Sequence, residues 1–209
     1  IHVKTKEPVE ISGSIAGYRP TFFLVGENDY VALQGIHGRE ETGITRIEIV
    51  GHNSVGEDIY SIEQNVLVDS GYFPDDPPIY VDPITIQPDV VEPEMALVEG
   101  IVGQITPERY WNEIFRYPVD EPCLSAFYGG SRIYNGTYQY YHTGIDFNVC
   151  KANNINIYAV APGYVVYTGN LVVRGNAVII DHGWGVYSGY WHQSEILVQP
   201  GDYVAAGDL

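Results

Sequence analysis

The sequence predicts an all-β protein of two domains, joined by a proline-rich linker and one short helix. The 209 residues include 23 Gly, 13 Pro and 18 Tyr, a composition typical of turn-rich β proteins. Short apolar runs alternate with polar residues at a period of two and are separated by turn residues. Prolines are concentrated in residues 74–93, and this concentration divides the chain into two parts.

The first domain is expected over residues 1–73 as a small β-sandwich with an immunoglobulin-like architecture. Its candidate strands follow one another at short intervals, at residues 9–13, 21–25, 29–36, 44–51 and 59–68. Clusters of Gly, Asn and Asp between these runs predict the turns. Because no residues in this domain form a recognisable catalytic pattern, we expect an accessory or spacer role for it.

Residues 74–109 are expected to form the linker and the helix. Prolines at this density hold a chain extended and remove hydrogen-bond donors that a sheet would need. A helix is predicted over Glu94–Gln104, because Pro93 is tolerated in a first turn and apolar residues recur between Met95 and Val102. The second domain would then occupy residues 110–209.

The charge of the chain excludes two classes of partner. Ten Lys and Arg residues stand against 27 Asp and Glu residues, which gives a net charge of −17. Such an acidic surface repels nucleic acid and anionic lipid, so neither is expected as a partner. No stretch approaches the roughly 20 apolar residues of a membrane span. No signal peptide is recognisable, although the start at Ile1 is compatible with a processed or trimmed chain.

The segment Tyr141–Phe147 contains a candidate metal-binding pair, His142 and Asp146. A neutral imidazole and a carboxylate are ligands that Zn²⁺ accepts readily. A separation of four residues places both side chains on one face of a strand. In a fully extended strand, however, their Cα atoms would lie about 13 Å apart, so we expect a bend at Gly144. The alternative is a surface His and Asp beside an edge strand.

Four further motifs follow this segment in a fixed order. They are Tyr158–Tyr167, Val178–Gly183, Tyr190–His192 and Val198–Asp208. Together the five motifs resemble the lysostaphin-type (LytM-like) zinc metallopeptidases, over roughly residues 115–209. The resemblance implies a duplicated-hybrid-motif antiparallel β fold for the second domain. It also implies hydrolysis of peptide bonds in bacterial peptidoglycan. It does not extend to the first hundred residues.

The resemblance assigns roles to individual residues. It implies that His142 and Asp146 are Zn²⁺ ligands and that His192 is the catalytic residue that faces the metal-bound water. His182 matches a family position with a structural role. In the family a third ligand comes from a His-x-His motif, which is absent from these 209 residues. We therefore expect a C-terminally incomplete metallopeptidase domain that binds zinc weakly and is inactive as given.

The function expected from these residues is that of a secreted zinc metalloendopeptidase. Its partner would be peptidoglycan or its cross-bridge peptides, outside the cytoplasm. One alternative is a catalytically degenerate LytM-like protein that binds cell wall or regulates another hydrolase. Another is an unrelated secreted β protein with a binding role. The presence of His142, Asp146 and His192 together favours the enzyme, whereas the oligomeric state is not determined by the sequence.

The two cysteines, Cys123 and Cys150, bracket the candidate metal-binding pair. Disulfides persist outside the cytoplasm, where the resemblance places this protein, so we expect the two to be bonded. Two buried free thiols, or Cys150 as a metal ligand, are the alternatives.

Overall fold

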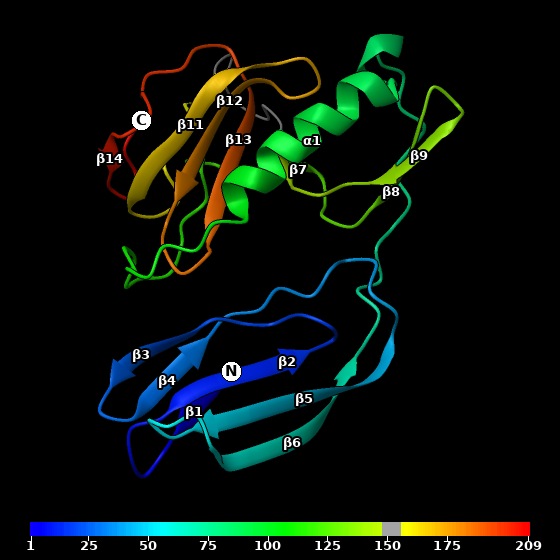
Figure 1. The fold of residues 1–209 in the computed structure, drawn as a ribbon. Coiled ribbons are helices and arrows are strands. Elements are labelled where there is room, and N and C mark those ends of the chain that lie inside the picture. The colour runs from blue at the N-terminus through cyan, green and yellow to red at the C-terminus, as the bar shows by residue number, and fades with distance from the viewer. Residues whose placement is uncertain (148–155) are drawn as a thin grey trace. The chain divides into compact units, whose positions relative to one another are not determined.

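The computed structural model describes residues 1–147 and 156–209, which are almost entirely strands, turns and loops (Figure 1). The chain divides into two compact units, Ile1–Tyr72 and Phe73–Leu209. The prediction of an all-β protein is confirmed, whereas the immunoglobulin-like and hybrid-motif details stay predictions. In the part of the chain that the structure describes, no helix has the length and apolar character of a membrane span.

The first unit contains two antiparallel sheets of three strands each. One has the order β1 (His2–Lys4), β4 (Asp29–Ala32), β3 (Phe22–Gly26), and the other β2 (Glu10–Ile15), β5 (Gly43–His52), β6 (Asp58–Val68). Val3 and Tyr30 of the first sheet pack with Ile49 of the second in one buried cluster. The alternation in β5 is the reason for this packing, because Ile47 and Ile49 turn inward while Glu48 faces solvent.

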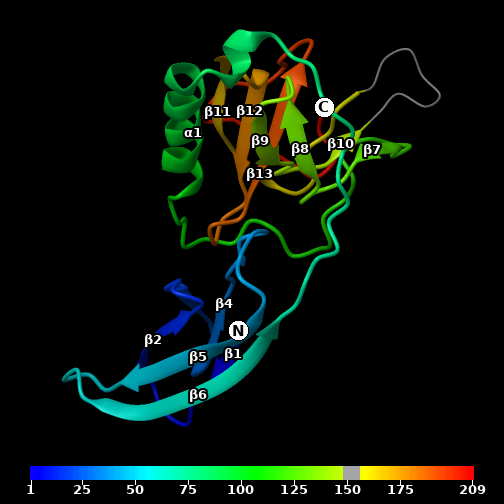
Figure 2. The same cartoon turned by 90° about the vertical axis from the view of Figure 1, so that its right-hand side faces the viewer.

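The second unit is built on a four-stranded antiparallel sheet. Its order is β13 (Tyr187–Gln193), β12 (Gly175–Asp181), β11 (Gly163–Leu171), β14 (Tyr203–Val204). Five buried residues form the core on this sheet: Ala159, Val165, Val178, Ile180 and Val204. Two short antiparallel strand pairs accompany it (Figure 2). The hairpin of β8 (Ser131–Tyr134) with β9 (Tyr138–Tyr141) lies in the chain between the strands of the other pair, β7 (Leu124–Ala126) and β10 (Asp146–Phe147).

The proline-rich segment belongs to the second unit, and part of it pairs with β8. The Asp76 N–H donates to the Ser131 carbonyl at 2.9 Å, and the Ile79 N–H donates to the Ile133 carbonyl at 3.0 Å. The segment therefore runs parallel to β8 and supplies the backbone partners that β8 lacks on that side. A short 3₁₀-helix, η1 (Pro83–Ile86), follows.

The helix α1 spans Pro88–Val102, so it begins six residues before the predicted start at Glu94 and ends two residues before Gln104. The first-turn proline is Pro88, whose fixed φ and missing N–H suit that position. Pro93 lies inside the helix instead. We placed the boundary at the wrong proline, because both satisfy the same local rule. The helix packs against β11, and its buried residue is Glu94.

Candidate metal centre

His142 is held in place by its backbone and by its ring. Its N–H donates to the Gly130 carbonyl at 2.8 Å, and its carbonyl accepts from the Gly129 N–H at 2.7 Å. The residue is 8% exposed, and its Nδ1 lies 3.0 Å from the Phe127 carbonyl oxygen. Since a carbonyl oxygen can only accept a hydrogen bond, Nδ1 carries the proton. In the neutral ring, Nε2 is then the nitrogen with a free lone pair.

Asp146 reaches the same point from the start of β10. The chain bends at Gly144, and this bend brings Asp146 Oδ1 to 3.1 Å from His142 Nε2. The pairing of Asp146 with Ala126 in β7 anchors the backbone beyond the bend. On an extended strand these two side chains would be too far apart to share an ion. The bend brings their ligand atoms together.

This pair has the chemistry of a cation site. A neutral Nε2 and a carboxylate oxygen are both acceptors, so at 3.1 Å they need a proton or a cation between them. Two ligands on one tetrahedral zinc, each about 2.0 Å from the ion, are about 3.3 Å apart. The residues present therefore fit a zinc ion. Within residues 1–147 and 156–209, no group of three or more His, Cys, Asp or Glu side chains could hold a metal, so this region supplies two ligands.

Arg132, in β8, braces the carboxylate of Asp146. Its Nη2 donates to Asp146 Oδ2 at 2.7 Å, and its Nε donates to Asp76 Oδ2 at 2.7 Å. Burial by itself would lower the pKa of the guanidinium. The hydrogen bonds to Asp76 and Asp146 outweigh burial and raise that pKa above its ordinary value. Arg132 therefore occupies Oδ2 and leaves Oδ1 directed at His142.

The sequence did not reveal this brace. Arg132 and Asp76 are 56 residues apart, and the second lies in the segment that we predicted as a linker. No short motif joins them. The only sequence signal was an arginine shortly before a candidate metal ligand in a chain with few basic residues.

His192 lies near the end of β13 with an exposed side chain. Its φ is +58°, a left-handed conformation that is uncommon for histidine. Among the described residues, no hydrogen bond or ion pair joins it to His142 or Asp146. The structure therefore brings two of the three predicted site residues into contact and gives no direct link to the third.

His182 is wholly buried and satisfied at both ring nitrogens. Nδ1 lies 2.8 Å from the Pro162 carbonyl oxygen, and Nε2 lies 2.8 Å from Ser188 Oγ. Burial lowers the pKa of the imidazole, so the neutral form is favoured. These contacts connect the start of β11 to β13, which fits a structural role.

Tyrosines of the β8–β9 hairpin form a contiguous aromatic group near His142. Tyr138 and Tyr140 are stacked with ring centroids 6.3 Å apart, and Tyr140 and Tyr141 lie 5.1 Å apart. Burial raises the pKa of Tyr140, and the nearby positive charge of Arg174 partly offsets this rise. The hairpin that leads to His142 thus comes close to the β11–β12 turn, which contains Arg174.

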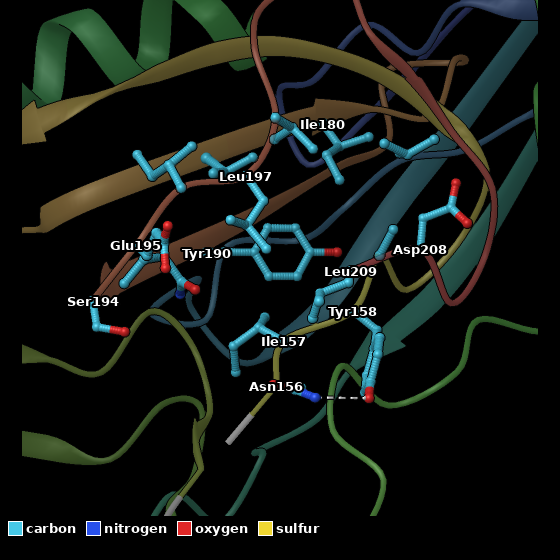
Figure 3. A pocket seen from close by; sticks show the side chains of 16 residues that line it. Asn156, Ile157, Tyr158, Ile180, Tyr190, Ser194, Glu195, Leu197, Asp208 and Leu209 are labelled. Atoms are coloured by element: carbon cyan, nitrogen blue, oxygen red, sulfur yellow. Dashed lines mark hydrogen bonds between the residues drawn. The ribbon is translucent and has the colours of Figure 1, made fainter. Parts of the chain in front are cut away.

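A separate pocket of about 170 Å³ lies on the core side of the sheet (Figure 3). Tyr190 and Leu197 stand in its wall, and Ile157 and Tyr158 lie across from them. The residues that line it, all from the described part of the chain, include none of the three predicted site residues. The pair formed by His142 and Asp146 is therefore not part of this pocket.

The predicted bridge between Cys123 and Cys150 involves residue 150, which lies outside the described residues.

Comparisons with known proteins match part of the second unit to one family. Residues 140–209 match the sequence model described as peptidase family M23. A curated protein, peptidoglycan DD-endopeptidase ShyA of Vibrio cholerae serotype O1, is 35% identical over 94 residues, which are 44% of this chain and 21% of that protein. The matched part thus spans about a fifth of the relative's length. These matches confirm the resemblance to LytM-type peptidases.

A solved structure matches the chain along most of its length. It is a crystal structure from Pseudomonas aeruginosa that is described as a peptidase M23. The TM-score is 0.66 at 24% sequence identity, and the match covers 99% of this chain and 77% of that one. At this identity the match shows that the fold is shared.

Proposed function

We propose, on the premise that residues 140–209 belong to peptidase family M23, that this protein is a zinc metalloendopeptidase acting on bacterial peptidoglycan outside the cytoplasm. The observation that carries the proposal is the 3.1 Å approach of His142 Nε2 to Asp146 Oδ1, in a tautomer that leaves Nε2 available. The peptidoglycan endopeptidase named among the relatives supports the choice of substrate.

The first part of the mechanism is the binding of zinc by His142 Nε2 and Asp146 Oδ1. A zinc ion held there supplies a Lewis acid for the scissile carbonyl and for the attacking water. The hydrogen bond from His142 Nδ1 to the Phe127 carbonyl fixes the ring orientation. It also makes the lone pair of Nε2 a stronger ligand for a metal ion. Arg132 binds Asp146 Oδ2, so Oδ1 is the oxygen of Asp146 that would hold the ion together with His142 Nε2.

The second part of the mechanism is the action of His192 on the substrate. Its exposed imidazole is accessible to a bound peptide. As a neutral base it would take a proton from the attacking water, and as an imidazolium it would donate a hydrogen bond to the developing oxyanion. Removal of His192 should therefore lower the rate and leave zinc binding intact.

Zinc titration and hydrolysis assays test the proposal together. A competing chromophoric chelator would report zinc affinity for the wild-type protein, His142→Ala, Asp146→Asn and the control His37→Ala, an exposed histidine of the first unit. We expect weak binding by these 209 residues, because the described part offers two ligands. Both site variants should abolish that binding, and the control should not. In the full-length protein, both should also abolish release of soluble fragments from labelled peptidoglycan. Unchanged zinc affinity in both site variants would contradict the proposal.

A second candidate function is zinc-independent binding or regulation at the cell wall by a degenerate family member. The restriction to two metal ligands within the described residues favours it. It predicts that the full-length protein sediments with purified peptidoglycan in the presence of a chelator and releases no fragments when zinc is added. Zinc-dependent release of fragments would exclude it.

A further inference from the structure

We propose that Glu94 and Arg174 are positioning residues for His192. In this arrangement α1, which precedes the part of the chain matched to peptidase family M23, sets the orientation of the imidazole through the ion pair of the buried Glu94 with the partly buried Arg174. The inference rests on the proposed catalytic role of His192. It adds Glu94 and Arg174, which have no part in the mechanism proposed above.

The starting point is the strained backbone at His192. Asn176 pairs with Gln193 and Val178 pairs with Tyr190, so Trp191 and His192 together face a single residue of β12. This is a β-bulge, a device that re-aims a side chain and is frequent beside active sites. The φ of +58° at His192 is a strained conformation for a residue other than glycine, and such a conformation persists only where the surroundings impose it.

Arg174 is the residue that imposes this conformation. Its carbonyl oxygen accepts a hydrogen bond from the His192 N–H at 2.8 Å. Its guanidinium lies over the ring of Trp191, 5.5 Å from the centroid. Arg174 therefore contacts both residues of the bulge, one through its backbone and the other through its side chain.

Glu94 in turn holds Arg174. The carboxylate accepts from the Arg174 N–H at 3.2 Å, from Arg174 Nη1 at 2.8 Å and from the Val173 N–H at 2.9 Å. Glu94 is 7% exposed, so water cannot replace it readily if it is removed. One carboxylate of α1 thus accepts hydrogen bonds from three donors of the β11–β12 turn.

The turn also lies close to the imidazole. Gly175 has a φ of +62°, and a Cβ added there would lie 3.3 Å from His192 Nδ1. A side chain at position 175 would therefore press on the ring. The space beside the ring is limited by the residue that follows Arg174, so a displacement of the turn should change the position of the ring.

Kinetics of the full-length, zinc-loaded protein test the proposal. Glu94→Gln keeps the size of the side chain but places an amide group against the turn's donors, whereas Glu92→Gln changes an exposed residue of the same helix as a matched control. Because a displacement of about 1 Å can cost about 100-fold in rate, we expect Glu94→Gln to lower kcat by about that factor. KM and zinc affinity should change less than about twofold, and Glu92→Gln should behave as wild type.

A double variant separates positioning from a general loss of structure. If Glu94 acts through His192, Glu94→Gln should lower kcat no further in a His192→Ala background. An equal loss in both backgrounds would overturn the proposal.

Nuclear magnetic resonance of the His192 ring gives a readout that does not depend on activity. Its signals, identified by their absence in His192→Ala, should shift in Glu94→Gln and in Gly175→Ala and stay unchanged in Glu92→Gln. Gly175→Ala also serves if Glu94→Gln does not fold. If His192→Ala is fully active, the proposed catalytic role fails, but the ring signals still test the positioning. Unshifted signals in both variants would refute it.

Discussion

Replacement of Asp76 by Asn tests the brace on the candidate metal ligand Asp146. The substitution keeps the shape of the side chain and removes one of the two carboxylates bound to Arg132. The side chains of Arg132 and Asp76 are 11% and 15% exposed, and their N–O distance is 2.7 Å. The interaction is therefore largely shielded from solvent, and its loss should be measurable.

The expected magnitude follows from what remains after the change. Removal of one partner of a fully buried ion pair costs about 3–5 kcal/mol, because the other charge is left alone. Here Arg132 keeps its hydrogen bond to Asp146, so no buried charge is stranded. The loss should then be that of one charge-assisted hydrogen bond, about 2 kcal/mol. This corresponds to about 30-fold in the unfolding equilibrium.

Urea denaturation monitored by tryptophan fluorescence is the appropriate assay. All three tryptophans of the chain lie after residue 72, so the signal reports on the second unit. Asp120→Asn is the matched control. Asp120 pairs with Arg116 at 3.3 Å, with side chains 71% and 41% exposed, and such a pair contributes at most about 1 kcal/mol.

The comparison of the two variants shows whether the contact between Asp76 and Arg132 stabilises the fold. Asp76→Asn should shift the free energy of unfolding clearly more than Asp120→Asn. If both variants unfold at the same urea concentration as the wild type, Arg132 does not depend on Asp76, and the brace is not an energetic feature of the fold.

Three further predictions concern the second unit. Gly183→Ala should destabilise it by about 3 kcal/mol or more in the same urea assay, because φ is +83° and the added Cβ would lie 1.8 Å from a backbone carbonyl oxygen. In Gly136→Ala, at φ +73°, the added Cβ would have no neighbour within 4 Å, so this variant measures the backbone strain alone. It should lower the free energy of unfolding clearly less than Gly183→Ala. Burial lowers the pKa of His182 in the folded protein. At a pH just below the ordinary value of 6.5, His182 is therefore protonated in the unfolded state but not in the folded state. The stability should therefore fall with pH from about 6.5 downward, and His182→Gln should flatten this dependence; an identical pH profile would contradict the assignment. A disulfide between Cys123 and Cys150 should leave no titratable thiol in the denatured, unreduced protein, and its reduction should cost roughly 3–4 kcal/mol.

The sequence was sufficient for the features that depend on neighbours along the chain. The period-two alternation in 44–51 predicted a strand, and β5 spans these residues. The structure adds that Ile47 and Ile49 are on its inward face. Gly144 between His142 and Asp146 predicted the bend, since two ligands four residues apart cannot meet on an extended strand. The five ordered motifs from Tyr141 onward predicted the resemblance to LytM-type peptidases, which the match of residues 140–209 to peptidase family M23 confirms.

The tertiary structure decided which distant charges meet. Arg132 and Asp76 are 56 residues apart, and Arg174 and Glu94 are 80 apart. Asp76 comes from the proline-rich segment, which local rules predicted to be an extended linker, and Glu94 comes from the helix that follows it. Proline content and periodicity describe how a short piece of chain can fold. They do not determine which buried charge it will contact, because that choice depends on which surfaces the whole unit brings together and on the cost of leaving a buried charge without a partner.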